Sequence, residues 1–262
     1  MGPSSYLELY GSWAQMDGYY SYYSPYWGGG FAGRANFWVA PQWSIQTDFS
    51  GDTAVSSFDN SPLNDVLAGA HVSWRDPSRG LIGGFAGFAG TDDYQGSEGL
   101  DGNFYAGIEG QAYLGNLTLY GQVGHLWQFN GYYSPSDHDG HDNWFAQLDA
   151  RYFVSPSTKI EGKIGYINGS IWGYTDGEYS ANGVTFGAEV EHQLKVLPFS
   201  VFARFNGLID NQYETRPVHQ YAAALGIRIR FGGADTLQAQ DRNGATLTVY
   251  DFSPIGWYRW ND

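Results

Sequence analysis

The stretch Tyr221-Ala222-Ala223-Ala224-Leu225-Gly226-Ile227-Arg228-Ile229-Arg230-Phe231 alternates apolar side chains with small or charged ones. Successive side chains of a β-strand point to opposite faces, so this period of two predicts a strand with one apolar and one polar face. The polar face carries Arg228 and Arg230, the apolar face ends at Phe231, and the breaker Gly232-Gly233 follows at once. On the second face of a soluble sandwich strand we expect mixed polar groups instead.

This pattern resembles the closing strand of bacterial outer-membrane β-barrel proteins, in which the last strand alternates toward a terminal aromatic residue, here Phe231. The resemblance is to the porin-like class as a whole and singles out no family within it. It implies an all-β fold, a transmembrane antiparallel up-and-down barrel in the bacterial outer membrane. Lipid and lipopolysaccharide would surround such a barrel, and small polar solutes would pass through it.

The composition favours strands and excludes several classes of protein. The 37 Gly, 21 Tyr, 16 Phe and 10 Trp suit strands and tight turns better than helices, so we expect almost no helix. A net charge of −14 with 13 Lys and Arg argues against nucleic acid as a partner. The absence of cysteine excludes disulfides, thiolate metal sites and cysteine nucleophiles. No run of 18 apolar residues predicts a transmembrane helix, but barrel strands cross a membrane with alternating hydrophobicity.

Segments of period two predict twelve strands. Long connections follow the odd strands and short turns follow the even ones, as a barrel with an outer loop side and a periplasmic turn side requires. Both ends of the barrel then face the periplasm. The glycine content of the fifth strand leaves its facing open. The strands are expected near residues 5–15, 31–40, 43–51, 66–75, 81–90, 104–114, 117–129, 144–154, 160–166, 184–191, 199–209 and 221–231.

The chain is expected to divide into a barrel, residues 1–231, and a C-terminal extension, residues 232–262. The extension ends in the aromatic run Trp257-Tyr258-Arg259-Trp260. It is a departure from relatives that stop at the terminal aromatic residue. We weigh three alternatives for it: a poorly ordered tail, a segment folded into the lumen, and a surface for a periplasmic partner or for self-association. At the other end, Met1-Gly2-Pro3 shows no signal peptide, so we expect a mature or trimmed form.

Charged side chains on the strands identify the inner face. An arginine that faces the middle of a bilayer costs about 2–4 kcal/mol, so the arginines and the acids that share their face should point into the lumen. Seven acids and seven bases then make a nearly neutral inner wall, and most of the net charge lies in loops and ends. The predicted pore-lining residues are Glu8, Arg34, Asp48, Arg75, Glu109, Asp149, Arg151, Glu161, Lys163, Glu189, Glu191, Arg204, Arg228 and Arg230.

This balance of charge has two interpretations. Acids and bases on opposite walls would set a transverse field across an open pore, whereas intermingled charges would pair and fill the barrel. Twelve strands do not decide between them, because barrels of this size lie between filled small barrels and wide porins. The adjacent pairs Glu189/Glu191 and Arg228/Arg230 suggest segregation by strand. We therefore favour an open but narrow pore.

Two acidic loops are candidates for cation binding. A run of carboxylates and imidazoles can hold a divalent cation, although a solvated loop is the ordinary interpretation and the spacing is not that of an EF-hand. A second acidic loop, with Asp92, Asp93, Glu98 and Asp101, has the same interpretation or binds Ca²⁺ beside lipopolysaccharide. No other cofactor is expected. The residues of the first candidate are Asp137, His138, Asp139, His141 and Asp142.

The leading functional hypothesis is a passive outer-membrane channel for small polar solutes or ions. The competing hypothesis is a non-conducting structural or docking protein that acts through its acidic loops or its aromatic tail. A hydrolase is a weaker alternative, because His125 and His138 lie near polar residues without forming a spaced motif, and we do not expect an enzyme. A soluble secreted β-barrel is the remaining alternative.

Overall fold

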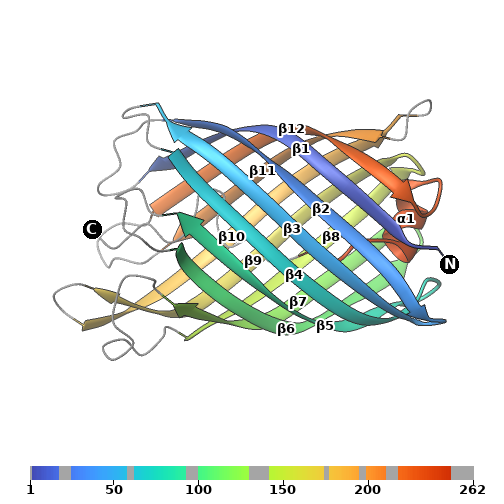
Figure 1. Ribbon diagram of the computed structural model, residues 1–262, viewed down its shortest axis with the longest axis horizontal. Helices are drawn as coiled ribbons and strands as arrows, with labels where there is room; N and C mark the ends of the chain where they lie inside the picture. Colours follow the sequence, from blue (N-terminus) through green and yellow to red (C-terminus); the bar gives the residue numbers. More distant parts are fainter. Residues whose placement is uncertain are drawn as a thin grey trace.

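Twelve strands and one short helix form the part of the chain that the computed structural model describes (Figure 1). That part comprises residues 2–17, 25–57, 62–92, 100–129, 142–173, 177–194, 199–210 and 218–248. The elements are β1 (Ser4–Asp17), β2 (Tyr26–Ala40), β3 (Trp43–Ser56), β4 (Pro62–Asp76), β5 (Gly80–Asp92), β6 (Leu100–Leu114), β7 (Leu117–Phe129), β8 (Asp142–Ser155), β9 (Thr158–Gly173), β10 (Gly177–Gln193), β11 (Phe199–Asp210), β12 (Val218–Gly232) and α1 (Leu237–Asn243).

The strands close into a single antiparallel barrel. Each strand pairs with its neighbours along the chain, and β1 pairs with β12 from Ser4↔Gly232 to Asp17↔His219. Closure gives the backbone groups of both end strands a partner, which a barrel in lipid requires. The prediction of a twelve-stranded antiparallel barrel is confirmed, and the stretch 221–231 lies in the strand that closes it.

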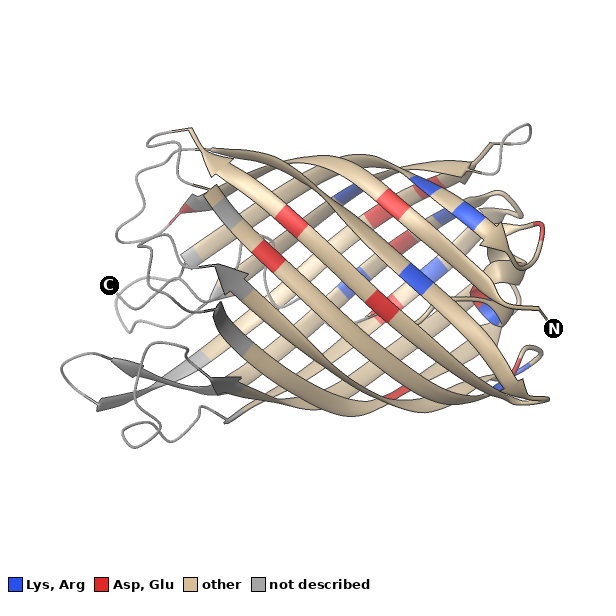
Figure 2. Ribbon diagram, in the orientation of Figure 1, with Lys and Arg blue, Asp and Glu red and all other residues tan. Residues whose placement is uncertain are grey.

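The two faces of the wall differ as the sequence alternation predicts. Outward side chains are apolar and well exposed, for example Leu225 at 71% and Ile108 at 65%. Inward side chains include charged groups that are buried, for example Glu8 and Arg75. The exterior therefore matches lipid and the interior holds the polar groups. Figure 2 shows positive and negative positions interspersed over the strands rather than gathered on two separate sides.

Several strands extend beyond their predicted ends toward the long loops. β3 reaches Ser56, and β10 begins at Gly177, seven residues before the predicted residue 184. Only residues 174–176 separate β9 from β10, so the predicted strict alternation of long and short connections is wrong at this hairpin. Hydrophobic alternation is needed only where one face meets lipid. Beyond the part of the strand that meets lipid, the backbone hydrogen bonds between strands continue. A polar sequence such as that of residues 177–183 has no hydrophobic alternation there, so it does not predict the strand.

Part of the interior is apolar. Phe85 and Phe145 are buried inside the barrel with their ring centroids 6.1 Å apart, and this resolves the facing of the glycine-rich β5. Glycines make room for these rings: a Cβ at Gly107 would lie 2.6 Å from the Phe85 ring, and one at Gly124 would lie 2.5 Å from the Phe145 ring. We call this layer the filled wall. Its members on β5, β6, β7, β8, β9 and β11 are Phe85, Tyr105, Leu126, Phe145, Ile167 and Leu208.

The chain turns back toward the barrel after β12. Gly232 and Gly233 have φ values of 67° and 79°, a left-handed conformation that glycine adopts without strain. α1 follows, with Thr236 as its N-cap accepting from the backbone N–H of Ala239 at 3.2 Å. Figure 1 shows α1 at the same end of the barrel as the N-terminus and the short turns. Within the described residues, no helix is long and apolar enough to cross a membrane.

Candidate functional site

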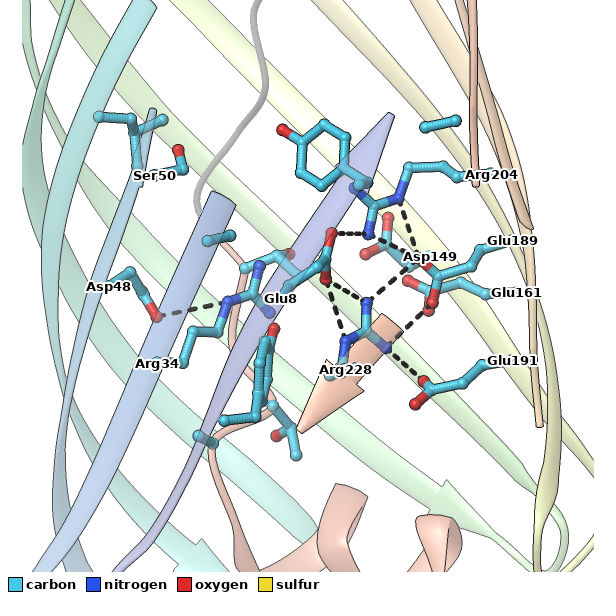
Figure 3. A pocket seen from close by; sticks show the side chains of 18 of the residues that line it. Glu8, Arg34, Asp48, Ser50, Asp149, Glu161, Glu189, Glu191, Arg204 and Arg228 are labelled. Carbon is cyan, nitrogen blue, oxygen red and sulfur yellow. Dashed lines mark hydrogen bonds and ion pairs between the residues drawn. The ribbon is translucent and has the colours of Figure 1, made fainter. Parts of the chain in front are cut away.

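A cavity of about 340 Å³ lies inside the barrel (Figure 3). Its lining begins at Ser4 and Gly232, at the short-turn end, and reaches Ser12 and Asp52 toward the long-loop end. The eight residue steps from Ser4 to Ser12 correspond to about 26 Å of strand, so the cavity is elongated along the wall. We call the small side chains that border it the open wall, which consists of Ser12, Ala32, Ser50, Ala222 and Ala224.

The structure places the fourteen predicted residues inside the barrel, but in two groups. Arg75 and Glu109 are buried away from the cavity, in contact with other inward groups. The other twelve predicted residues border the cavity. Those that line the cavity are Glu8, Arg34, Asp48, Asp149, Arg151, Glu161, Lys163, Glu189, Glu191, Arg204, Arg228 and Arg230.

Most of the charges that line the cavity belong to one network of ion pairs on β1 and on β8 to β12. Glu8 contacts Arg204 at 2.8 Å and Arg228 at 2.6 Å. Arg204 also contacts Glu189 at 2.8 Å, and Lys159 contacts the same carboxylate at 3.0 Å. Figure 3 shows Glu8, Glu189, Arg204 and Arg228 pointing toward one another across the strands. A buried carboxylate is stable only when paired in this way, so the network holds its own members in place.

Acids and bases are therefore intermingled, and the suggested segregation by strand does not produce two oppositely charged walls. Glu191 on β10 and Arg228 on β12 form an ion pair across β11, where the inward residue between them is the small Ser200. Arg230 pairs with Glu191 in the same way. Adjacent like charges on one strand are thus neutralised by the strand after next. A single strand's sequence does not reveal this partner.

A second network lies on β2, β3, β4, β6 and β7. His71 contacts Asp48 through Nε2 at 2.5 Å and Glu109 through Nδ1 at 2.9 Å. An imidazolium donates from both nitrogens, which suits a ring held between two carboxylates. Arg34 contacts Asp48 at 3.4 Å, and Tyr120 donates to Glu109 at 2.8 Å. His71 was not among the predicted residues, although its alternation with Arg75 was a usable signal.

The C-terminal segment, residues 233–248, enters the lumen from the short-turn end. Barrel side chains bind its backbone: Arg75 donates to the Gly244 carbonyl at 2.7 Å, and the Gln46 side chain pairs with both backbone groups of Leu247 at 2.8 and 3.1 Å. The Tyr120 hydroxyl, whose single proton is shared with Glu109, also lies 3.0 Å from the carbonyl oxygen of Thr248. The described part of the extension therefore folds into the barrel, which was one of the three alternatives.

Two further contacts fix the segment. Asp241 accepts from Thr118 at 2.7 Å and from Arg151 at 3.0 Å. Leu247 is fully buried against Leu81 on β5 and Tyr120 on β7, in a cluster separate from the filled wall. The cavity runs beside the segment, since several segment residues are also part of its lining. These are Leu237, Gln240, Asp241, Gly244, Ala245, Thr246 and Thr248.

The candidate cation sites lie largely outside the described residues. This applies to Asp137, His138, Asp139 and His141, whereas Asp142 is the first residue of β8. In the other loop, Asp93 and Glu98 lie outside the described residues, and Asp92 and Asp101 lie at the ends of β5 and β6. Among the residues with described side chains, no group of three His, Asp or Glu is arranged to hold a metal ion.

His125 does not lie in the lumen. It shares the outward face of β7 with Val123 and Trp127, and its ring lies 4.5 Å from that of Trp127 and 4.7 Å from that of Trp144 on β8. Between two tryptophans it has the surroundings of an interfacial aromatic group. His138, the other histidine weighed for catalysis, lies outside the described residues.

Comparisons with known proteins support the fold. No protein-family model matches the chain, and no curated protein matches it by sequence. Among solved structures it is similar to an outer membrane channel from Pseudomonas putida F1, with a TM-score of 0.60, 14% identity, and coverage of 88% of this chain and 96% of that one. It is also similar to the translocator domain of the autotransporter NalP from Neisseria meningitidis, with a TM-score of 0.52, 13% identity, and coverage of 88% and 89%.

The chain is similar to the KdgM porin as well, with a TM-score of 0.50, 10% identity, and coverage of 87% of this chain and 99% of that one. At these identities the likeness concerns the fold. The predicted fold, an antiparallel up-and-down β-barrel of the kind found in bacterial outer-membrane proteins, is confirmed.

Proposed function

We propose that this protein is an outer-membrane channel for small polar solutes or ions, with a bore that its own C-terminal segment narrows. The observation that carries the proposal is the elongated cavity along the open wall, which continues beside residues 233–248 instead of ending at them. Charged and polar side chains line it, so water and polar solutes can replace part of their hydration there. The channel-like neighbours in fold agree with this function without specifying it.

The competing function is a non-conducting structural or docking barrel. It draws support from the dense pairing of charges and from the segment that occupies the short-turn end of the lumen. Paired charges and an inserted segment both reduce the space for a solute. The two functions differ in one measurable property, the conductance of a bilayer that contains the purified protein.

Two cysteine variants test whether the protein forms a channel and whether that channel follows the open wall. The chain has no cysteine, so Ala224→Cys and Ala223→Cys each introduce a single thiol. Ala224 lines the cavity, whereas its neighbour Ala223 is exposed on the outer face. In a planar bilayer we expect discrete conductance steps for both variants. A charged methanethiosulfonate reagent should reduce the steps of Ala224→Cys and leave those of Ala223→Cys unchanged.

Two results would count against the proposal. A silent bilayer, with protein shown to be folded and inserted, would favour the non-conducting barrel. Conductance that the reagent leaves unchanged at Ala224→Cys would mean that solutes do not follow the open wall.

A further inference from the structure

The charges that line the cavity are not equally accessible. The side chains of the paired carboxylates Glu8, Glu189 and Glu191 are 2%, 8% and 1% exposed. Those of Arg34 and Arg204 are 22% and 24% exposed. These three carboxylates are therefore covered by their partners, whereas the two arginines keep a surface toward the cavity.

These two arginines, and Lys163 as a third cation, have hydrogen-bond donors without acceptors in the described part of the chain. Arg34 meets Asp48 through Nε, and its two terminal nitrogens have no acceptor there. Arg204 uses Nε and Nη2 on Glu8 and Glu189, which leaves Nη1. Lys163, also on the cavity, makes neither a hydrogen bond nor an ion pair with described residues. These donors border the cavity, where an oxygen of a solute can accept from them in place of water.

Packing holds these three cations in position. The Arg34 guanidinium lies 5.5 Å from the centre of the Tyr6 ring, and that of Arg204 lies 4.8 Å from the Phe202 ring. Lys163 lies across Gly187, where an added Cβ would be 2.6 Å from the lysine Cε. Because aromatic rings and backbone support them, the cations need no movement to receive an anion.

We infer that the passage contains an oxyanion site formed by Arg34, Arg204 and Lys163, and that its solutes are small anions with a carboxylate or phosphate group. The inference rests on the proposed channel function. The planar fork of an arginine matches two oxygens of a carboxylate or phosphate, and a lysine adds a point charge. A cavity of about 340 Å³ has the volume of roughly ten waters, enough for a compact organic anion.

Acidic groups at the long-loop end of the cavity do not cancel this site. Asp52 and Asp65 are cross-strand partners on β3 and β4, and Asp52 accepts a hydrogen bond from the Tyr10 hydroxyl. They lie further along the passage than Arg34, whose cross-strand partner Asp48 is four residues before Asp52 on β3. A solute therefore meets the acids and the cationic site at different heights.

The test is the reversal potential of the full chain in a planar bilayer under a KCl gradient. Despite its net charge of −14, the wild type should pass Cl⁻ in preference to K⁺. Arg34→Gln and Lys163→Gln should each lower the ratio of Cl⁻ to K⁺ permeability about fivefold, the effect of one unit charge acting over a few ångströms of water. Lys163→Gln breaks no ion pair within 4 Å among the described residues and removes the positive charge opposite Asp149 on β8. Arg79→Gln is the matched control, because Arg79 is 86% exposed in the turn between β4 and β5 and should leave the ratio unchanged.

The outcomes separate the inference from the function on which it rests. A silent bilayer overturns the channel itself. A channel that prefers K⁺, or one in which Arg34→Gln and Lys163→Gln behave like Arg79→Gln, overturns the anion site and leaves the channel standing. Potassium acetate and potassium phosphate gradients then distinguish the two oxyanion types, and permeability to neither would also overturn the site.

Discussion

The open wall and the filled wall of this barrel have the same strand geometry and opposite contents. On the filled wall, aromatic rings such as Phe85 and Phe145 occupy the interior over glycines of the neighbouring strands. On the open wall, Ala222 and Ala224 on β12 and Ser12 on β1 leave the cavity unfilled. The difference shows that the free space inside a twelve-stranded barrel depends on the volume of its inward side chains as well as on the number of strands. It also shows that one cylinder can combine a packed core with a passage.

The largest effect is expected from emptying the filled wall. Phe145 is 2% exposed, so Phe145→Ala should lower the free energy of unfolding by about 3–5 kcal/mol through lost burial and a new cavity. Urea unfolding of the lipid-reconstituted protein, followed by tryptophan fluorescence, measures it. The open wall provides the control: Ala222→Gly should cost no more than about 1 kcal/mol. Equal losses at the two positions would remove the distinction between the walls.

A smaller effect is expected from overfilling the filled wall. A Cβ at Gly107 would lie 2.3 Å from the Val123 carbonyl oxygen and 2.6 Å from the Phe85 ring. Gly107→Ala should therefore lower the free energy of unfolding by about 1–3 kcal/mol in the same unfolding measurement. Gly162→Ala adds the same methyl group where no atom lies within 4 Å, and should change stability by about 0.5 kcal/mol or less. A Gly107 variant as stable as the Gly162 variant would contradict close packing of this wall.

The smallest effect is expected from loosening the segment that lies between the two walls. Leu247→Asp places a charge against Leu81 and Tyr120, and the segment should leave the lumen because that burial is unfavourable. Single-channel conductance should rise about twofold as the bore widens. Leu247→Met keeps an apolar side chain of similar volume and should conduct as the wild type does. Conductance that stays the same in Leu247→Asp would mean that the segment does not narrow the passage.

Alternation and charge were enough to predict the barrel. Each strand has to present apolar groups to lipid, so residues such as Arg228 and Glu8 reveal the inner face of their own strand and of its neighbours. Lys159 was missed, although it is a member of the larger ion-pair network, because it follows the turn directly and was assigned to no strand. Its alternation with Glu161 and Lys163 would have placed it on the inner face.

Contacts between distant parts of the chain could not be predicted from the sequence. The pairing of Glu191 with Arg228 depends on a small residue, Ser200, on the strand between them. The docking of residues 233–248 depends on side-chain donors of β3, β4, β7 and β8 that bind backbone carbonyls, and a backbone carbonyl has no sequence signature. The filled wall could not be predicted for a similar reason. Phe and Tyr occur on both faces of this barrel, and only their packing distinguishes the inward from the outward ones.

The tether at Gly232 and Gly233 has a kinetic consequence. A segment joined to the mouth of its own binding site by a two-residue hinge experiences an effective concentration in the millimolar range or above. Weak intrinsic affinity is then sufficient for nearly full occupancy, and departures from the site are followed by rapid return. A channel narrowed by such an intramolecular ligand should show brief, repeated transitions to a wider state, at a frequency that does not depend on protein concentration.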